Sequence, residues 1–300
     1  MTVAVHVGPE PVPVLIEAVQ RAGGRVVPLD EAEAIVFYGG GPEQLRPMLH
    51  DGIRWVQLPS AGIERFAEAG IISEHPVITA ATGSYGLPVA EHSVALMLAA
   101  ARALYRSARA KTWEPKTSRE FAGSTVAIVG FGGIGQALMP MLQPFGCRVL
   151  AVTDSGEAPG ADLVLPRARY REVLPQADYV VVLAPATPET RGMFGKREFE
   201  LMREDAWLVN VSRGSLVVTG ELVDALRAGR IGGAALDVTD PEPLPDGHPL
   251  WSLDNVLITP HSANPPSSYW RGLTERVTSN VRRFGEGAPL EGVVSPSRGF

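Results

Sequence analysis

The segment Thr125-Val126-Ala127-Ile128-Val129-Gly130-Phe131-Gly132-Gly133-Ile134-Gly135 decides the fold. Its β-branched and apolar start predicts a buried strand that runs directly into a glycine-rich turn, and the stretch from Ile134 to Phe145 predicts the helix that leaves the turn. Because 32 of the 300 residues are glycine, about 0.36 matches to a GxGxxG pattern are expected by chance. The strand before the turn and the helix after it therefore give the match its weight.

This strand, turn and helix form the arrangement that holds the pyrophosphate of a dinucleotide. Gly130 permits the tight turn, Gly132 lets the backbone approach the pyrophosphate, and Gly135 lets the helix pack on the strand. Gly133 and Ile134 lie at the helix N-terminus, which faces the negative charge. The turn predicts a Rossmann-type nicotinamide dinucleotide site.

The second strand of this unit, Arg148 to Val152, predicts which dinucleotide binds. An acidic residue after this strand accepts hydrogen bonds from the adenosine ribose, and Thr153 and Asp154 follow it. No arginine follows immediately to hold a 2′-phosphate, which favours NAD. Arg167 could reach the same corner from the next strand end, so NADP stays open.

Composition limits the classes of partner. A chain of 300 residues is longer than one hydrophobic core usually organises, so two domains are expected. The net charge of −6 favours neither nucleic acid nor an anionic membrane surface as partner. The start does not resemble a signal peptide, no apolar run has membrane-spanning length, and Cys147 has no second cysteine to pair with. We expect a soluble cytoplasmic protein in which Cys147 is a small buried residue.

Short apolar runs alternate with amphipathic ones from Val3 to Ala80 and again from Ser124 to about Pro260. This alternation predicts an α/β fold with two Rossmann-like, doubly wound parallel-sheet domains. Pro88 opens an alanine-rich helix that extends to about Leu104, and a final helix runs from Ser268 to Phe284. Pro140 and Pro144 predict that the helix after the glycine turn is bent or shortened. The basic residues after the alanine-rich helix favour a solvated face over an anion site; they are Arg102, Arg106, Arg109, Lys111 and Lys116.

Three polar segments follow apolar strands in the second half of the chain, and each carries one chemically useful side chain. These are Arg213 in 210–214, Glu242 in 237–245 and His261 in 259–263. Singly, each residue has a plain surface or turn explanation. Because the carboxyl ends of parallel strands line the ligand crevice, the three are expected to converge on the cofactor. Together they are the groups needed to reduce a 2-oxo acid.

At these motifs the sequence resembles the D-isomer-specific 2-hydroxyacid dehydrogenase family, over nearly the whole chain. Val209 to Gly214 is similar to the family's arginine motif, Gly233 to Pro245 to its glutamate motif, and Pro249 to His261 to its histidine motif. The resemblance implies cofactor contacts from Ala184, Pro185, Thr190, Val211, Ser212, Arg213, Asp237, His261 and Ala263, with Asp237 facing the nicotinamide amide.

The resemblance also implies a mechanism. Hydride passes from the nicotinamide to the substrate carbonyl carbon while protonated His261 gives a proton to the oxygen. Glu242 stabilises the imidazolium, and Arg213 fixes the substrate carboxylate and polarises the carbonyl. Pro59 to Ile63 resembles the loop whose amides hold the carboxylate, which gives Ser60, Ala61 and Gly62 as substrate-binding residues, although a plain strand-to-helix turn remains an alternative. Tyr85 either touches substrate or packs.

By the same resemblance, residues 1–90 and 272–300 form a flavodoxin-like substrate domain, and residues 91–271 form the dinucleotide-binding domain. The active site is then expected in the cleft between them. Residues 91–120 are expected to form a homodimer contact. No metal ligands are predicted.

Departures from family patterns narrow the substrate. The family's ribose-binding aspartate falls on Thr153; Leu58 replaces the basic residue typical of phosphoglycerate members; Ala61 replaces the lysine of phosphite-oxidising relatives; and Glu242 replaces the glutamine of formate-oxidising ones. A small 2-oxo acid such as glyoxylate or hydroxypyruvate is expected.

Two alternatives stay open: a phosphoglycerate dehydrogenase, and a dinucleotide-sensing, corepressor-like interaction protein. Two others are disfavoured. Ser212 lacks the leading glycine of a hydrolase nucleophile elbow, and Thr190 occupies the first glycine position of a P-loop.

Overall fold

The computed structural model describes residues 2–114 and 117–295, so Lys116 lies outside the described residues. The chain divides into two compact units: unit 1 is Met1–Tyr85 with Pro265–Phe300, and unit 2 is Gly86–Asn264. The divisions fall at 85/86 and 264/265, whereas the sequence suggested 90/91 and 271/272. They differ because the whole of the helix Gly86–Ala101 belongs to unit 2 and the whole of the last helix, Pro266–Glu286, to unit 1.

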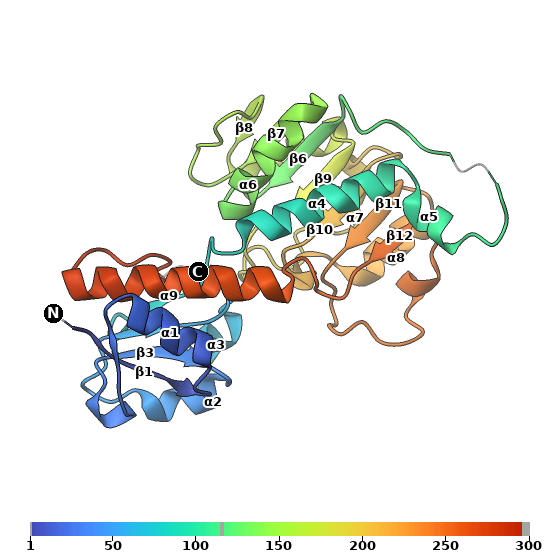
Figure 1. The fold of residues 1–300 in the computed structure, drawn as a ribbon. Coiled ribbons are helices and arrows are strands. Elements are labelled where there is room, and N and C mark those ends of the chain that lie inside the picture. Colours follow the sequence, from blue (N-terminus) through green and yellow to red (C-terminus); the bar gives the residue numbers. More distant parts are fainter. Residues whose placement is uncertain (1, 115–116, 296–300) are drawn as a thin grey trace. The chain divides into compact units, whose positions relative to one another are not determined.

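Unit 1 is built on a parallel sheet that, in the described part of the chain, has five strands in the order β2-β1-β3-β4-β5. This is the order of flavodoxin-like doubly wound sheets. The strands are β1 (Ala4–Pro9), β2 (Arg25–Val26), β3 (Ala34–Tyr38), β4 (Trp55–Gln57) and β5 (Val77–Thr79). The helices are α1 (Pro13–Arg21), α2 (Pro42–Leu45), α3 (Glu64–Glu68) and α9 (Pro266–Glu286), with 3-10 turns η1 (Leu29–Glu31) and η2 (Arg46–Met48). Figure 1 shows α1 beside the long helix α9, against which it packs.

A buried polar network ties α9 to the end of β4. Asn280, Gln57 and Thr79 are fully buried, and the Asn280 side-chain amide donates to Gln57 Oε1 at 2.9 Å. The Gln57 amide in turn donates to the carbonyl of Leu58 at 2.9 Å. Buried polar groups are costly unless they are paired, so this network fixes the point at which the chain leaves β4.

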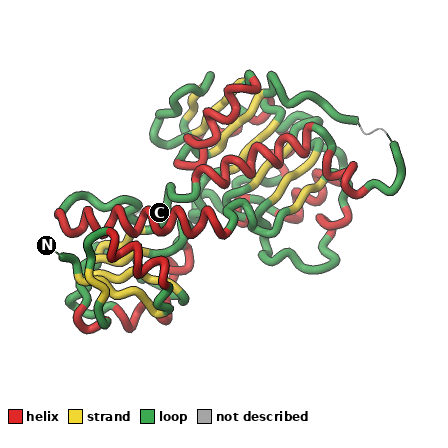
Figure 2. Tube along the Cα trace, in the orientation of Figure 1, coloured by secondary structure: helices red, strands yellow, loops and turns green. Residues whose placement is uncertain are grey.

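Unit 2 contains a parallel sheet of seven strands among the residues described, in the order β12-β11-β10-β9-β6-β7-β8. The winding reverses between β6 and β9, as in a Rossmann sheet, which confirms the predicted fold class. The strands are β6 (Thr125–Val129), β7 (Arg148–Val152), β8 (Leu163–Leu165), β9 (Tyr179–Val182), β10 (Trp207–Asn210), β11 (Gly233–Leu236) and β12 (Val256–Ile258). Figure 2 shows these strands in yellow between layers of helix.

The helices of unit 2 include the two that adjoin the glycine turn. They are α4 (Gly86–Ala101), α5 (Leu104–Arg109), α6 (Gly133–Leu142), α7 (Lys196–Leu201) and α8 (Thr219–Arg227). The 3-10 turns are η3 (Gln143–Phe145), η4 (Arg167–Glu172), η5 (Leu174–Gln176), η6 (Gly214–Leu216) and η7 (Pro249–Ser252). The largely apolar core is formed where these elements cover the sheet.

Two sequence expectations about these helices are tested by the structure. The helix after the glycine turn is shortened as predicted, because α6 ends at Leu142 and gives way to the 3-10 turn that contains Pro144. The alanine-rich helix begins at Gly86 and not at Pro88, since proline is tolerated in a first helical turn. A Cβ at Gly86 would lie 2.7 Å from the carbonyl oxygen of Gly133, so glycine is needed where α4 meets α6.

Within residues 2–114 and 117–295, no helix combines the length and apolar character that crossing a membrane requires. The described side chains also contain no cluster of three or more His, Cys, Asp or Glu able to hold a metal ion. Cys147 is half-buried next to β7, and burial raises the pKa of its thiol to about 11.

Candidate active site

The glycine turn lies where β6 and β9 are neighbours. Gly130 has a φ of +102°, and a Cβ there would lie 2.5 Å from the backbone nitrogen of Ala184. Its N–H donates to the carbonyl of Val152 at 2.9 Å. Only glycine allows this conformation and this close approach, so the turn is fixed against the chain that leaves β9.

Gly132 has a different surrounding. It caps the N-terminus of α6, and a Cβ there would meet nothing within 4 Å. The amides of the first helical turn have no partner inside the helix and present partial positive charge. The backbone here is therefore open to an anionic group, and the residues present fit the pyrophosphate of a dinucleotide.

The predicted ribose corner carries a pair of opposite charges. Asp154 follows β7, Arg167 begins the 3-10 turn after β8, and Arg167 Nε lies 3.1 Å from Asp154 Oδ2. The side chains are 64% and 42% exposed respectively, so both remain reachable. Thr153 is buried, and its hydroxyl accepts the N–H of Ser155 at 3.2 Å. Of the two predicted residues, Asp154 is the one with an exposed side chain.

The loop after β9 is held by internal hydrogen bonds. The Thr190 hydroxyl donates to the carbonyl of Pro185 at 2.7 Å, and the Ser212 hydroxyl donates to the carbonyl of Ala184 at 2.6 Å. Thr190, Ala184, Ser212, Val211 and Ala263 are all buried. These residues therefore contribute to the packing at the carboxyl edge of the sheet, and their side chains are not exposed for contact with a ligand.

His261 and Glu242 form the central pair. Nδ1 of His261 lies 2.7 Å from Glu242 Oε1, and because an ionised carboxylate can only accept, Nδ1 carries the donated hydrogen. The imidazole is 52% exposed and the carboxylate 42% exposed. Nε2 of His261 is thus left to exchange a proton with an external group while Glu242 holds the ring.

Arg213 is brought to the same sheet edge. Its guanidinium Nη1 donates to the carbonyl of Ser212 at 2.7 Å, and its own carbonyl accepts the Asn210 amide at 2.9 Å. The next residue, Gly214, lies so close to the segment before Glu242 that a Cβ would fall 1.9 Å from the oxygen of Thr239. The segment 210–214, here called the arginine loop, and the segment 237–245, the glutamate loop, are therefore packed backbone against backbone.

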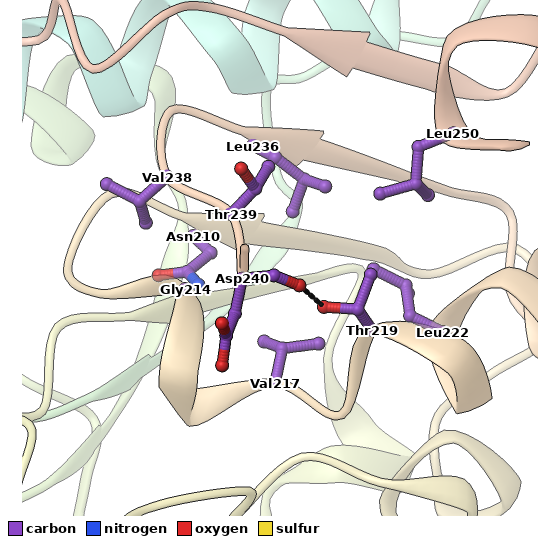
Figure 3. A pocket seen from close by; sticks show the side chains of 10 residues that line it. All are labelled: Asn210, Gly214, Val217, Thr219, Leu222, Leu236, Val238, Thr239, Asp240 and Leu250. Carbon is purple, nitrogen blue, oxygen red and sulfur yellow. Dashed lines mark hydrogen bonds between the residues drawn. The ribbon is translucent and has the colours of Figure 1, made fainter. Parts of the chain in front are cut away.

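Figure 3 shows Gly214 close to Thr239 and Asp240, with the α8 side chain Thr219 to the right of Asp240 and joined to it by a dashed line. The Thr219 hydroxyl donates to the carbonyl of Asp240 at 2.6 Å. The cavity among these residues is about 10 Å³, which is at the limit for a single water. It is a packing gap beneath the two loops and not a substrate pocket.

Asp237 follows β11 and is almost fully buried, with 1% of its side chain exposed. Oδ1 accepts from the Thr259 hydroxyl at 2.5 Å and the Ser262 N–H at 2.9 Å, and Oδ2 accepts from the Ala263 N–H at 3.1 Å. Burial favours the neutral acid, but hydrogen bonds from His92, Thr259 and the two amides outweigh it and hold the pKa of Asp237 at about 2. That Asp237 faces the nicotinamide amide stays a prediction.

Sequence reasoning missed His92 and Asn210. His92 lies on α4, far along the chain, with Nε2 2.9 Å from the Thr259 hydroxyl oxygen. The side chain of Asn210 bonds to two consecutive residues of the arginine loop: Oδ1 accepts the Ser212 N–H at 3.1 Å, and the side-chain amide donates to the carbonyl of Arg213 at 2.9 Å. A local signal existed for Asn210, since Asn competes well for nearby backbone groups at a strand end. None existed for His92.

Unit 1 carries the predicted substrate loop at the carboxyl end of β4. The Ser60 hydroxyl donates to the carbonyl of Gly62 at 2.6 Å, and Ala61 between them is exposed. Tyr85 is buried, donates its hydroxyl hydrogen to the carbonyl of Pro59 at 2.8 Å, and stacks on Tyr269 with ring centroids 5.4 Å apart. In this structure Tyr85 packs against the loop and supports it.

The comparisons with known proteins identify the family of the chain. The family described as D-isomer specific 2-hydroxyacid dehydrogenase, NAD binding domain, matches residues 94–263. The chain belongs to this family. The match includes the glycine turn and the segments of Arg213, Glu242 and His261, so the resemblance stated from the sequence is confirmed.

Relatives of this chain include both uncharacterized and named proteins. An uncharacterized protein from Corynebacterium melassecola is 40% identical over 293 residues, covering 94% of this chain and 95% of that protein. A glyoxylate reductase from Pyrococcus furiosus is 37% identical over 213 residues, covering 66% of this chain and 62% of that enzyme. A solved NADPH-dependent glyoxylate/hydroxypyruvate reductase from Sinorhizobium meliloti is 26% identical, with a TM-score of 0.81 and 100% of both chains covered.

Substitution of Gly130 and substitution of Gly132 should have different effects. Gly132→Ala should keep the melting temperature and weaken dinucleotide binding at least about tenfold, because its Cβ occupies the open backbone face. Gly130→Ala should instead lower the melting temperature, because its Cβ collides with Ala184. Thermal unfolding and NADH fluorescence titration measure the two effects. Unchanged NADH affinity in a folded Gly132→Ala protein would contradict the site.

Proposed function

We propose that the protein is an NAD(P)H-dependent reductase of small 2-oxo acids, with glyoxylate or hydroxypyruvate as the substrate class. The observation that carries this proposal is the 2.7 Å pair of His261 and Glu242, placed at the carboxyl edge of a dinucleotide-type sheet beside the loop of Arg213. The names of the P. furiosus and S. meliloti relatives support the substrate class.

In this proposal, the chain's own residues bind the substrate and move one proton. When bound, the nicotinamide supplies the hydride that reduces the carbonyl carbon. His261 donates the proton on Nε2 to the carbonyl oxygen as negative charge develops there, and Glu242 stabilises the imidazolium through Nδ1. The acid then regains its proton from solvent, to which the half-exposed ring is open.

Substrate orientation is assigned to a cation and a loop. Arg213 is permanently charged, so it can hold the 2-oxo acid carboxylate and polarise the carbonyl. Ser60, Ala61 and Gly62 hold the carboxylate through backbone amides, since the exposed Ala61 leaves them accessible. Leu58 is buried and offers no charge to a phosphate tail, which favours a small uncharged tail over phosphoglycerate.

A turnover assay tests the function. Oxidation of NADH and NADPH should be followed at 340 nm with glyoxylate, hydroxypyruvate, 3-phosphohydroxypyruvate and longer 2-oxo acids. Glyoxylate or hydroxypyruvate should give the highest kcat/KM. Dinucleotide binding without turnover of any 2-oxo acid would point to a corepressor-like sensor, and a preference for 3-phosphohydroxypyruvate to a phosphoglycerate dehydrogenase.

His261→Ala should lower kcat about a hundredfold while NADH affinity stays within about twofold, because it removes the acid and leaves the glycine turn that binds the pyrophosphate unchanged. His50→Ala is the matched control, since His50 is an exposed histidine of unit 1. Steady-state kinetics and fluorescence titration give the two quantities. A kcat within about threefold of the unmodified value would remove His261 from the mechanism.

Cofactor choice is assigned to the Asp154 and Arg167 pair. The unmodified protein should prefer NADH, because Asp154 accepts from the ribose hydroxyls and repels a 2′-phosphate. Asp154→Ala should shift the kcat/KM ratio about tenfold towards NADPH, whereas Arg167→Ala should shift it towards NADH. Glu157→Ala, at an exposed site nearby, should leave the ratio unchanged. Equal use of both cofactors by the unmodified protein would contradict this assignment.

A homodimer contact is proposed through α4, α5 and the segment that follows. Leu87, Leu104 and Trp113 are 56%, 54% and 103% exposed and offer apolar surface to such a contact. Sedimentation equilibrium should give twice the chain mass, and Trp113→Lys should shift the protein towards monomer. A monomeric unmodified protein at micromolar concentration would contradict the contact.

A further inference from the structure

The turn that carries His261 is held in an uncommon conformation. His261 has a φ of +48°, in the left-handed region that residues other than glycine rarely adopt, at a cost of about 1 kcal/mol or more. Its N–H donates to the backbone carbonyl of Asp237 at 2.8 Å. Such a conformation persists only where its surroundings enforce it.

Asp237 supplies that enforcement from both its backbone and its side chain. The backbone carbonyl binds His261, and the buried carboxylate binds the Thr259 hydroxyl and the amides of Ser262 and Ala263. One residue therefore holds the turn before, at and after His261. A carboxylate this deeply buried needs its full set of donors to stay charged and in place.

The last donor to this group comes from another part of unit 2. His92 Nε2, on α4, lies 2.9 Å from Thr259 Oγ1 and 3.4 Å from Asp237 Oδ1. The Thr259 hydroxyl has a single hydrogen, which it gives to the carboxylate at 2.5 Å, so towards His92 it can only accept. Nε2 of His92 must therefore carry a hydrogen and donate it.

We propose that His92 is a positioning residue for the catalytic turn, which it holds through Thr259 and Asp237. The chain of donors runs from α4 to Thr259, from Thr259 to Asp237, and from Asp237 to the turn that carries His261. This proposal rests on the proposed function, because it gives His92 its role through His261. His92 touches neither substrate nor cofactor in this assignment.

A role in packing alone makes a different prediction. On α4, Val89 and Leu96 lie one turn before and after position 92 and are buried and apolar, so an apolar residue at position 92 would serve such packing equally well. His92 is 21% exposed, so it is not needed to fill the core. What the turn needs from position 92 is a donor.

Two substitutions distinguish the hydrogen-bond donor of His92 from the space that its side chain fills. His92→Leu keeps an apolar side chain of similar size and should lower kcat about tenfold, with NADH affinity unchanged within about twofold. His92→Gln restores a side-chain N–H near the position of Nε2 and should recover most of kcat. Glu91→Gln, at an exposed site on the same helix, is the control. Equal kcat losses in His92→Leu and His92→Gln, or none in His92→Leu, would overturn the proposal.

A second variant and a measurement without substrate make the test independent of turnover. Thr259→Val removes the hydroxyl that links His92 to Asp237 and should lower kcat as much as His92→Leu does. Because both substitutions break the same chain of hydrogen bonds, the double variant should have a kcat no lower than that of the less active single variant. Hydrogen exchange of the amides of 261–263 should accelerate in both single variants and not in His92→Gln. Unchanged exchange would overturn the positioning role, whereas an inactive unmodified protein with these exchange changes would overturn only the proposed function.

Discussion

The structure of unit 2 depends on one close approach between two strand ends. The backbone of Gly130 lies where a Cβ would stand 2.5 Å from the nitrogen of Ala184, so the chains leaving β6 and β9 are in direct backbone contact at this point. The other polar segments leave β10, β11 and β12, which continue the same sheet beyond β9. Because the strands of this sheet are parallel, their carboxyl ends lie along one edge. The segments of Arg213, Glu242 and His261 therefore follow one another along that edge, starting from the glycine turn.

Loops at such an edge would be loose without further constraint, and polar side chains supply it. The Ser212 hydroxyl ties the arginine loop to the carbonyl of Ala184, and the absence of a side chain at Gly214 lets the arginine loop lie against Thr239. Asp237 does the same for the histidine turn. The side chains of Ser212 and Asp237 are buried, so their hydrogen bonds face little competition from water.

The sequence was most informative where local pattern and chemistry coincide. The strand before Gly130, the shortened helix after it, and the strand ends before the segments of Arg213, Glu242 and His261 were all predicted, because apolar runs and turn residues are local signals. The bounds of the short strand β8, Leu163–Leu165, were not predicted, although Arg167 was expected to follow a strand end. The contact of His92 with Thr259 was also missed, because the two residues are 167 positions apart and no periodicity links them.

The candidate site combines a rigid, buried support with an exposed pair, His261 and Glu242, and the proposed reaction accounts for this division. Proton transfer needs an imidazole that an external group can reach, which agrees with the 52% exposure of His261. A half-exposed imidazole has few packing contacts to fix its position, so its orientation depends on how firmly its backbone is held. The almost fully buried carboxylate of Asp237 provides that fixing, so the pair that the proposed reaction uses stays reachable while the carboxylate that orients its turn is excluded from water.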